Sequence, residues 1–370
     1  MKILYIENIR LPTEKAHGIQ IMKMCEAFAN QGHETTLLIP KRKNDIDADP
    51  FDFYGVKRNF NIKRVWVPNV LFLGPLGFYL QSFYFSERSA WIMYLCRPDI
   101  VYSREERILL NLIFVAKNII WETHRGSWNF ATKIVSYFSK KIVVISNGLS
   151  KFYIDKNPKL FNKIVLAPDG VDLSLFDISL TKQECRSKLG LPPDKKIVLY
   201  AGHLYEWKGV HVLADVSKNM DNNELFVFVG GTFHDLIYFK SKYLQNKNCL
   251  ILGQKPYSEI PLYLKSADIL VLPNSAKDSI GSLYTSPLKL FEYMASGTPI
   301  VASSVPAICE ILNEINSTLF IPDSVDDLSR VIDIVFKDEE KVKTKAEQAK
   351  KDVMKYTWEA RAKHIVSTIV

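Results

Sequence analysis

Short runs of aliphatic residues alternate along the chain with longer segments in which apolar positions recur at helical spacing. Runs this short and this rich in Ile, Val and Leu are typical of strands in a parallel sheet that is covered on both faces. We expect strands at residues 2–6, 35–39, 100–102, 119–122 and 141–145, and then at 197–201, 225–230, 250–252, 269–272, 299–302 and 318–321. Their alternation with helices predicts an α/β fold built from βαβ units.

This pattern begins twice, at the N-terminus and again near Lys195. The turn-forming cluster Pro168-Asp169-Gly170 lies between the two series and is expected to mark a domain boundary. A length of 370 residues suits two domains, with a ligand held in the cleft between them. Because ligands of open parallel sheets bind beyond the carboxyl ends of the strands, motifs that directly follow strands are the candidates for chemistry.

The excess of positive charge lies in the first half of the chain. Residues 1–170 hold 24 basic and 15 acidic side chains, whereas residues 171–370 hold 24 and 25. Such a domain can attract nucleic acid, an anionic membrane or a phosphate-bearing substrate, and it can equally be an ordinary solvated surface. Because only charge suggests nucleic acid, we expect no nucleic-acid partner, and we keep peripheral contact with an anionic membrane as an option.

The five cysteines are scattered, and their spacing fits neither a zinc site nor a disulfide framework. This usage indicates a reducing compartment. The N-terminal sequence MKILYIENIR is typical of a core strand rather than of a signal peptide. We therefore expect a cytoplasmic protein, which would work at the inner face of the membrane if its acceptor is held there.

One apolar segment, residues 70–80, reads VLFLGPLGFYL and is too short to span a bilayer. It is either a helix buried against the sheet or a segment at a membrane interface, with its aromatic side chains at headgroup depth. We favour the buried helix.

The most specific motif is SPLKLFEYMASGTPIV at residues 286–301, a loop followed by a helix and a strand. Ser286 is expected to cap the helix, Pro287 to stand in its first turn and Gly297 to end it. A helix N-terminus after a strand offers backbone N–H groups to an anion. Glu292 stands among apolar neighbours and needs a hydrogen-bonding partner, either a basic neighbour or the two hydroxyls of a ribose.

Two further motifs follow predicted strands. The first, YAGHLYEWKG at residues 200–209, combines Gly202 and Gly209 with the movable cation Lys208, a composition that suits a diphosphate. The second, IIWETHRG at residues 119–126, places His124 at the edge of the first sheet, next to charged neighbours.

On these motifs the sequence resembles the family-4 retaining glycosyltransferases of GT-B fold, in a branch with the pattern Ser-Pro-Leu-Lys-x-x-Glu-Tyr-Met-Ala. The resemblance implies two Rossmann-like domains whose parallel sheets face each other across a cleft. The N-terminal, acceptor-side domain would span residues 1–169 and be joined by the last helix at 357–370. The nucleotide-sugar-binding domain would span 170–356.

The resemblance also implies roles for site residues. Glu292 would grip the nucleotide ribose, Lys208 would bind the donor phosphates, and His124 would face the donor sugar from across the cleft. The remaining donor-binding positions are Gly18, His203, Gln254, Lys255, Tyr284, Ser286, Pro287, Leu288 and Lys289. Among these, Tyr284 stands where the family has a glutamate, and His203 stands where it has an arginine.

The chemistry that the resemblance implies needs neither a cofactor nor a metal, and no Asp-x-Asp follows a predicted strand. Lys208, helix N-termini and His203 or Lys289 would stabilise the charge of the leaving diphosphate. We expect transfer of a hexose-type sugar, with retention, from a UDP-sugar in preference to a GDP-sugar. The acceptor would be a glycan or a lipid-linked molecule of surface polysaccharide or glycoconjugate synthesis.

Three other readings stay open. A nucleotide-sugar epimerase can share the fold, and it would convert the donor with nothing added. A non-catalytic binding protein could clasp a small ligand between two similar domains. A nucleic-acid-binding protein would show steep salt dependence.

Overall fold

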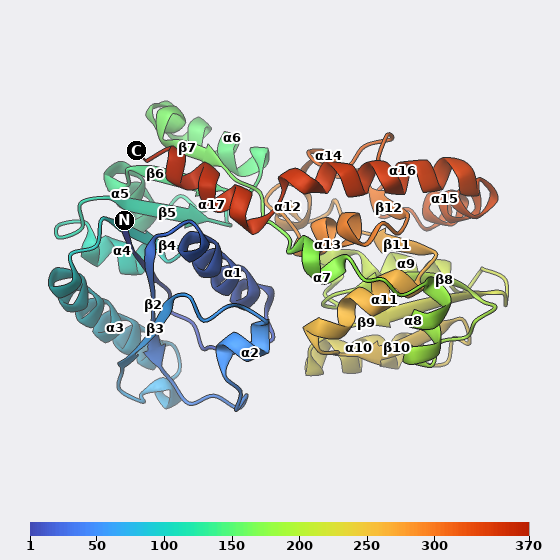
Figure 1. Cartoon of the computed structure of the whole chain (residues 1–370), viewed down its shortest axis with the longest axis horizontal. Helices are drawn as coiled ribbons and strands as arrows, with labels where there is room; N and C mark the ends of the chain where they lie inside the picture. The colour runs from blue at the N-terminus through green and yellow to red at the C-terminus, as the bar shows by residue number, and fades with distance from the viewer. Residues whose placement is uncertain (370) are drawn as a thin grey trace. The chain divides into compact units, whose positions relative to one another are not determined.

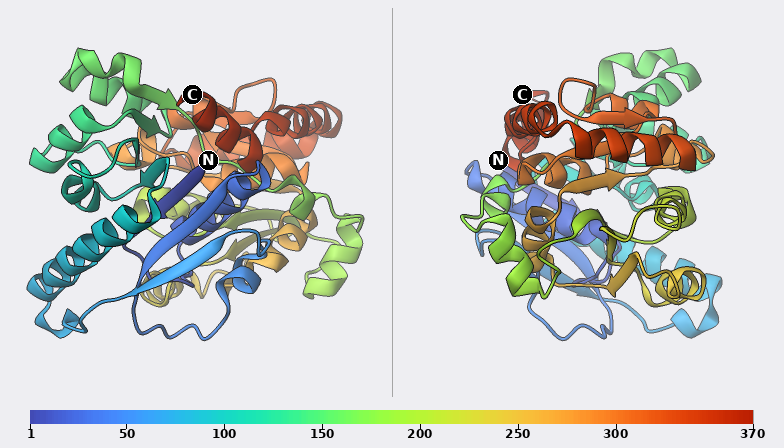
Figure 2. Two further views of the ribbon diagram at one scale, coloured as in Figure 1. Left: turned by 60° about the vertical axis from the view of Figure 1, so that its left-hand side comes forward. Right: turned by 90° about the vertical axis from the view of Figure 1, so that its right-hand side faces the viewer.

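The structure, a computed structural model, describes residues 1–369 and divides the chain into two compact units. The first unit comprises Met1–Pro168 together with the C-terminal segment from Trp358, and the second comprises Asp169–Thr357. Each unit is a parallel sheet with helices on both faces (Figures 1 and 2).

The first unit has a seven-stranded sheet in the order β3-β2-β1-β4-β5-β6-β7. Its strands are β1 (Lys2–Ile6), β2 (Glu34–Lys41), β3 (Asn61–Trp66), β4 (Ile100–Ser103), β5 (Ile119–Thr123), β6 (Lys141–Val144) and β7 (Ile164–Leu166). Its helices are α1 (Ala16–Asn30), α2 (Pro50–Tyr54), η1 (Leu71–Leu73), α3 (Pro75–Cys96), α4 (Glu106–Leu112), α5 (Phe130–Phe138), α6 (Asn147–Lys156), η2 (Pro158–Lys163) and α17 (Trp358–Ser367).

The second unit has a six-stranded sheet in the order β10-β9-β8-β11-β12-β13. Its strands are β8 (Lys196–Ala201), β9 (Glu224–Val229), β10 (Cys249–Gly253), β11 (Ile269–Leu272), β12 (Ile300–Ser303) and β13 (Thr318–Phe320). Its helices are α7 (Leu173–Phe176), α8 (Lys182–Leu189), η3 (Glu206–Lys208), α9 (Val210–Val216), α10 (Phe233–Tyr243), η4 (Tyr257–Glu259), α11 (Ile260–Ser266), α12 (Ser279–Ser282), α13 (Leu288–Ser296), α14 (Pro306–Cys309), α15 (Val325–Lys337), α16 (Glu339–Asp352) and η5 (Val353–Lys355).

The predicted strands are confirmed, with ends that shift by a residue or two, and the sheets are parallel. Alternate residues of β8 show why aliphatic runs form these strands: Ile197 and Leu199 join the apolar cluster on one face, while Val198 and Tyr200 join the cluster on the other. Strand β3 was missed because its sequence, NIKRVW, is mostly polar and exposed, as an edge strand tolerates. Strand β7 was missed because it has three residues.

The expectation that residues 70–80 form a buried helix is wrong. Helix η1 and the first turns of α3 expose nearly all their side chains, and Phe72 is 81% exposed. The physical reason is that α3 contacts the unit through small and polar residues such as Gly77 and Gln81. A Cβ at Gly77 would lie 1.7 Å from the Val70 carbonyl oxygen, so only glycine permits this approach.

Helix α17 packs on α1, where the side-chain amide of Gln31 donates to the carbonyl of Glu359 over 3.0 Å. No helix among residues 1–369 has the length and apolar character needed to cross a membrane.

Candidate functional site

The strand order of the second sheet reverses between β8 and β11, which is the point where open parallel sheets bind ligands. The loops that leave these two strands pack tightly against each other. A Cβ at Gly209 would lie 1.7 Å from the carbonyl oxygen of Pro273, and the Ser275 N–H donates to the carbonyl of Trp207 over 3.3 Å. Gly209 has a φ of 68°, so both its conformation and this contact require glycine.

Lys208 ends η3 in the loop after β8. Its ammonium lies 3.9 Å from the centre of the Trp207 ring, and burial lowers the pKa of Lys208 to about 8. A partly desolvated ammonium gains more from an anion than a hydrated one does, because less water must be displaced when the anion binds.

Lys289 lies in the first turn of α13 and reaches the same loop. Its Nζ is buried and has no hydrogen-bond partner among residues 1–369. It lies 3.8 Å from the centre of the Tyr200 ring, and a Cβ at Gly202 would lie 3.4 Å from it. Burial and the nearby Lys208 ammonium hold the pKa of Lys289 well below its usual range. Two lysine side chains therefore lie near the N-terminus of α13, and the acidic group that acts on Lys289 there is Glu292.

Glu292 lies one turn further along α13 and is buried. Its Oε1 accepts a hydrogen bond of 2.9 Å from the hydroxyl of Tyr257. Burial raises the pKa of Glu292 to about 7, against the opposing effects of Tyr257 and Lys289. The hydrogen-bond partner of the Glu292 carboxyl is thus a tyrosine from the loop after β10 rather than a basic side chain.

The loop before α13 differs from the expected cap. Helix α13 begins at Leu288, Pro287 precedes it in an extended conformation, and no side chain caps the helix. The Ser286 hydroxyl instead accepts a hydrogen bond of 2.9 Å from the backbone N–H of Asp169. The expectation that Ser286 caps the helix and that Pro287 occupies its first turn is therefore wrong, because Ser286 ties the loop to the start of the unit.

The other donor-site candidates of the second unit lie on its carboxyl-edge loops. Tyr284 follows α12, where its N–H donates to the carbonyl of Ser279 over 3.1 Å. Gln254 and Lys255 follow β10 in the loop that delivers Tyr257, with Gln254 exposed. His203 follows β8, accepts at its carbonyl from the Tyr200 hydroxyl over 2.6 Å, and stacks on Tyr205 with ring centres 5.1 Å apart.

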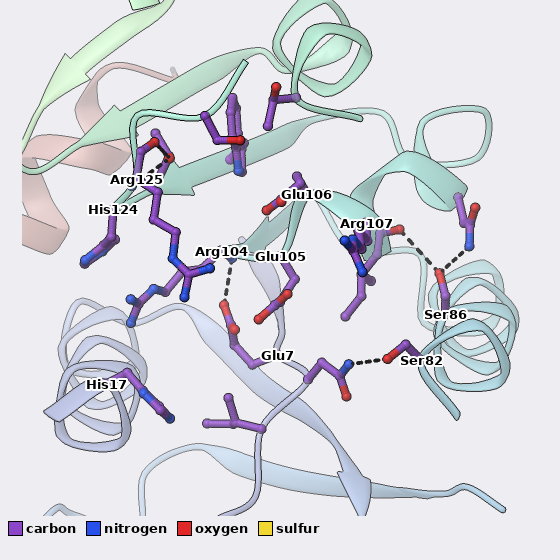
Figure 3. Close-up of a pocket in the computed structure, with 18 of the residues that line it drawn as sticks. Glu7, His17, Ser82, Ser86, Arg104, Glu105, Glu106, Arg107, His124 and Arg125 are labelled. Carbon is purple, nitrogen blue, oxygen red and sulfur yellow. Dashed lines mark hydrogen bonds between the residues drawn. The ribbon is translucent and has the colours of Figure 1, made fainter. Parts of the chain in front are cut away.

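The first sheet also reverses its order, between β1 and β4, and there the unit has a cavity of about 610 Å³ (Figure 3). His124 and Arg125 lie at one side of it, and the α3 residues Ser82 and Ser86 lie at the other. Its floor is highly charged: the Glu7 carboxylate accepts from the Arg104 N–H over 2.7 Å. Burial and Glu105 raise the pKa of Glu7 well above its usual range. Neighbouring carboxyl and guanidinium groups of this kind suit a ligand with many hydroxyls.

His124 is held by a network centred on Glu122. Its Nε2 lies 2.5 Å from Oε1 of Glu122. This oxygen also accepts from the Gln20 amide and lies 3.1 Å from the guanidinium of Arg361 in α17, while Oε2 accepts from the Tyr102 hydroxyl. Despite burial, Arg361 and His124 hold the pKa of Glu122 well below its usual range. Burial, followed by the charge of Arg104, lowers the pKa of His124 to about 4, so its ring is neutral at pH 7. With Nε2–H donating to Glu122, Nδ1 is left as a hydrogen-bond acceptor.

Gly18 lies in the first turn of α1, and a Cβ there would lie 2.2 Å from the hydroxyl of Tyr54. That hydroxyl accepts from the N–H of Thr13 and donates to its carbonyl. Glycine is therefore needed to fix the loop after β1, and it is the neighbouring His17 that lines the cavity.

Four residues that the sequence did not single out complete these sites: Tyr257, Glu7, Arg104 and Arg361. Glu7 carried a usable signal, because it directly follows the first predicted strand. Arg361 carried none, since it lies 239 residues from its partner Glu122.

Comparison with protein families matches residues 181–352 to the model described as "Glycosyl transferases group 1". Among curated proteins, the chain is 30% identical over 175 residues to the UDP-Gal:alpha-D-GlcNAc-diphosphoundecaprenol alpha-1,3-galactosyltransferase of Escherichia coli, covering 44% of this chain and 43% of that protein. It is 24% identical over 194 residues to the processive diacylglycerol alpha-glucosyltransferase of Acholeplasma laidlawii, covering 49% and 56%. The chain spans about half the length of the curated relatives that it matches first.

Among solved structures, HepE of Anabaena in complex with UDP has a similar fold. The TM-score is 0.78 at 15% identity, covering 100% of this chain and 99% of that one. Taken together, these findings show the fold of GT-B glycosyltransferases, with two Rossmann-like domains, and support a glycosyltransferase family for the chain through residues 181–352.

Proposed function

We propose that this protein is a metal-independent, retaining glycosyltransferase that moves a hexose-type sugar from a nucleotide-diphosphate donor to a glycan or lipid-linked acceptor. The observation that carries the proposal is the buried ammonium of Lys289, which has no hydrogen-bond partner among residues 1–369 and lies near Lys208 at the switch point of the second sheet. An unpaired buried cation is costly to the free protein. A bound diphosphate would offset that cost and stabilise both ammonium groups.

The arrangement of the second unit fits the parts of a nucleotide sugar. The diphosphate would lie against Lys208, Lys289 and the N-terminus of α13, and Glu292 would accept hydrogen bonds from the ribose hydroxyls. The loop with Gln254 and Lys255 would contact the base. UDP is favoured over GDP, and HepE, a protein of this fold, was solved with UDP and with UDP-glucose.

The cavity of the first unit is the proposed acceptor site, and its carboxyl and guanidinium groups would bind acceptor hydroxyls. His124 would accept a hydrogen bond from a hydroxyl of the donor sugar through Nδ1. Two relatives whose names include a diphosphoundecaprenol and a diacylglycerol acceptor support a lipid-linked acceptor. Synthesis of a surface polysaccharide or glycoconjugate would then be the role of the protein.

In the proposed reaction the acceptor hydroxyl oxygen bonds to the anomeric carbon on the face from which the diphosphate leaves. The bond between that carbon and the phosphate oxygen breaks, and the hydroxyl proton passes to the leaving phosphate. Lys208 and Lys289 would stabilise the charge that grows on the diphosphate, which is the usual role of preorganised cations at a leaving group.

Calorimetric titration with UDP, GDP, ADP and dTDP, with and without EDTA, tests the donor site. We expect UDP to bind, EDTA to change nothing, and Lys208→Ala to abolish binding. The matched control is Lys343→Ala, on the exposed face of α16. Failure of all four nucleotides to bind the native protein would overturn the proposal. Conversion of a UDP-sugar without any acceptor would instead indicate an epimerase.

A further inference from the structure

Helix α3 presents most of its large apolar side chains to solvent and buries a mixed side, in which small and polar residues outnumber the apolar ones. The buried side comprises Gly77, Gln81, Phe85, Ser86, Ser89 and Met93. The exposed side carries a stripe at helical spacing, with Leu76, Leu80, Phe83, Trp91 and Tyr94 between 48% and 62% exposed. An amphipathic helix normally buries most of its large apolar residues, whereas α3 buries Phe85 and Met93 and exposes the larger number, so the exposed stripe indicates a contact surface.

The apolar stripe is part of a larger surface. Helix η1 adds Leu71, Phe72 and Leu73, all exposed, and the edge strand β3 adds Trp66, whose ring lies 5.5 Å from that of Tyr84. At 1.5 Å per residue, the 22 residues of α3 extend over roughly 33 Å. The helix runs along the margin of the first unit (Figure 2, left).

The charges around this surface are mostly basic. Residues 61–98 contain four basic side chains, Lys63, Arg64, Arg88 and Arg97, and one acidic side chain, Glu87. Arg88 donates to the hydroxyl of Tyr84 over 2.9 Å, beside Glu87. Arginines also lie over exposed rings of α3, with Arg42 5.9 Å from the centre of Phe78 and Arg107 4.9 Å from that of Tyr79.

We propose that η1, the exposed stripe of α3 and Trp66 form a surface that binds to an anionic lipid bilayer, with the helix lying in the plane of the interface. Tyrosine and tryptophan prefer headgroup depth, leucine and phenylalanine enter the acyl boundary, and basic residues pair with anionic headgroups. The charges at Glu87 and Arg88 fit a helix that lies on a membrane and exclude one that crosses it.

The location of the surface connects it with the acceptor. Phe78, Tyr79 and Phe83 of α3 also line the cavity of the first unit. A molecule anchored in the bilayer could therefore extend its polar part directly into that cavity. Delivery of a lipid-linked acceptor to the cavity rests on the proposed function. Membrane binding is measured without any substrate, so membrane binding and glycosyl transfer can fail independently.

Co-sedimentation with vesicles tests the surface. We expect the native protein to bind vesicles of phosphatidylcholine and phosphatidylglycerol, and to bind pure phosphatidylcholine about tenfold more weakly. Replacing Phe72, Leu76 and Phe83 with serine should lower the partition coefficient by about a hundredfold. The matched control replaces Phe161, Phe233 and Ile315, which are equally exposed but lie elsewhere, and should change little.

Fluorescence gives a second measurement that does not depend on a folding-sensitive triple variant. Brominated lipids should quench tryptophan emission in the native protein and much less in the double variant Trp66→Phe/Trp91→Phe, while Trp207→Phe should keep the quenching. Equal binding by the native protein and the triple serine variant would overturn the proposal. A second result would also overturn it: the native protein binds no vesicles but self-associates with rising concentration, and the triple variant does not self-associate. The surface would then bind a second copy of this chain.

Discussion

The hydroxyl of Tyr257 donates a hydrogen bond to Oε1 of Glu292 over 2.9 Å, joining the loop after β10 to helix α13. The two residues lie 35 positions apart; Glu292 belongs to the predicted donor-binding motif, and Tyr257 lies two positions after the predicted donor-binding residue Lys255. The Tyr257 hydroxyl thus donates to the same carboxyl group of Glu292 that we propose as the acceptor for the ribose hydroxyls.

Replacing Tyr257 with phenylalanine should weaken nucleotide binding. The bond from Tyr257 lowers the pKa of Glu292 against burial. Without it, more of the carboxyl is protonated at pH 7, and a neutral carboxyl is a weaker acceptor for the ribose hydroxyls. A hydrogen bond to a charged group contributes about 1.5–3 kcal/mol, so we expect a loss of roughly tenfold or more in UDP affinity. Titration calorimetry measures this, with Tyr137→Phe, at an exposed site of the first unit, as the control. An unchanged affinity would show that Tyr257 does not tune Glu292.

The affinity for a nucleotide sugar should pass through a maximum between about pH 7 and about pH 8. Below the pKa of Glu292, which is about 7, binding must first remove a proton from the carboxyl, so affinity falls as the pH falls. Above the pKa of Lys208, which is about 8, the amine is neutral, so affinity falls as the pH rises. UDP-glucose is the suitable probe because its diphosphate keeps its charge throughout this range. A flat profile would contradict the assignment of these two groups to the site.

The sequence predicted the sheets well because burial on both faces leaves an aliphatic signature that does not depend on distant residues, as in β8. It failed for α3, where the apolar residues point outward. Hydrophobicity alone cannot distinguish a helix that buries such residues in the core from one that presents them to another phase, because both sequences contain the same side chains.

Some residues of the candidate site were predictable from the sequence, and others were not. Lys208 and Glu292 were predictable because each stands in a short motif directly after a strand or on a helix. Tyr257, which bonds to Glu292, and Tyr200, whose ring lies against Lys289, have no feature in the sequence that marks them as site residues. The Glu122–Arg361 pair, formed by strand β5 and the C-terminal helix, depends on the folded chain and leaves no local pattern.

Replacing Lys289 with methionine should stabilise the protein and weaken nucleotide binding together. Methionine has a similar length and no charge to desolvate, so we expect the free energy of unfolding to rise by about 1–2 kcal/mol. The loss of a charged partner for the diphosphate should reduce UDP affinity by at least about tenfold. Denaturant unfolding and calorimetry measure the two effects, with Lys343→Met as the surface control. A variant that loses stability and keeps its affinity would show that Lys289 is a structural residue.

Replacing Arg361 with methionine should destabilise the first unit, because the carboxylate of Glu122 would remain buried without its main counter-charge. Breaking a buried ion pair from one side costs about 3–5 kcal/mol. The folded pKa of Glu122 lies below its unfolded value of about 4.3, so the stability that the carboxylate contributes is present above that pH and is lost as the pH falls through the folded pKa.

The stability gap between the native protein and Arg361→Met should therefore be largest at neutral pH and should narrow below about pH 4. Hydrogen exchange of the peptide that contains β5 localises the effect to the first unit, where opening should become faster while the strands of the second unit stay protected. Adding Glu122→Gln to Arg361→Met removes the stranded charge and should recover part of the loss. If the double variant is less stable than Arg361→Met, the arginine acts through packing rather than through its charge.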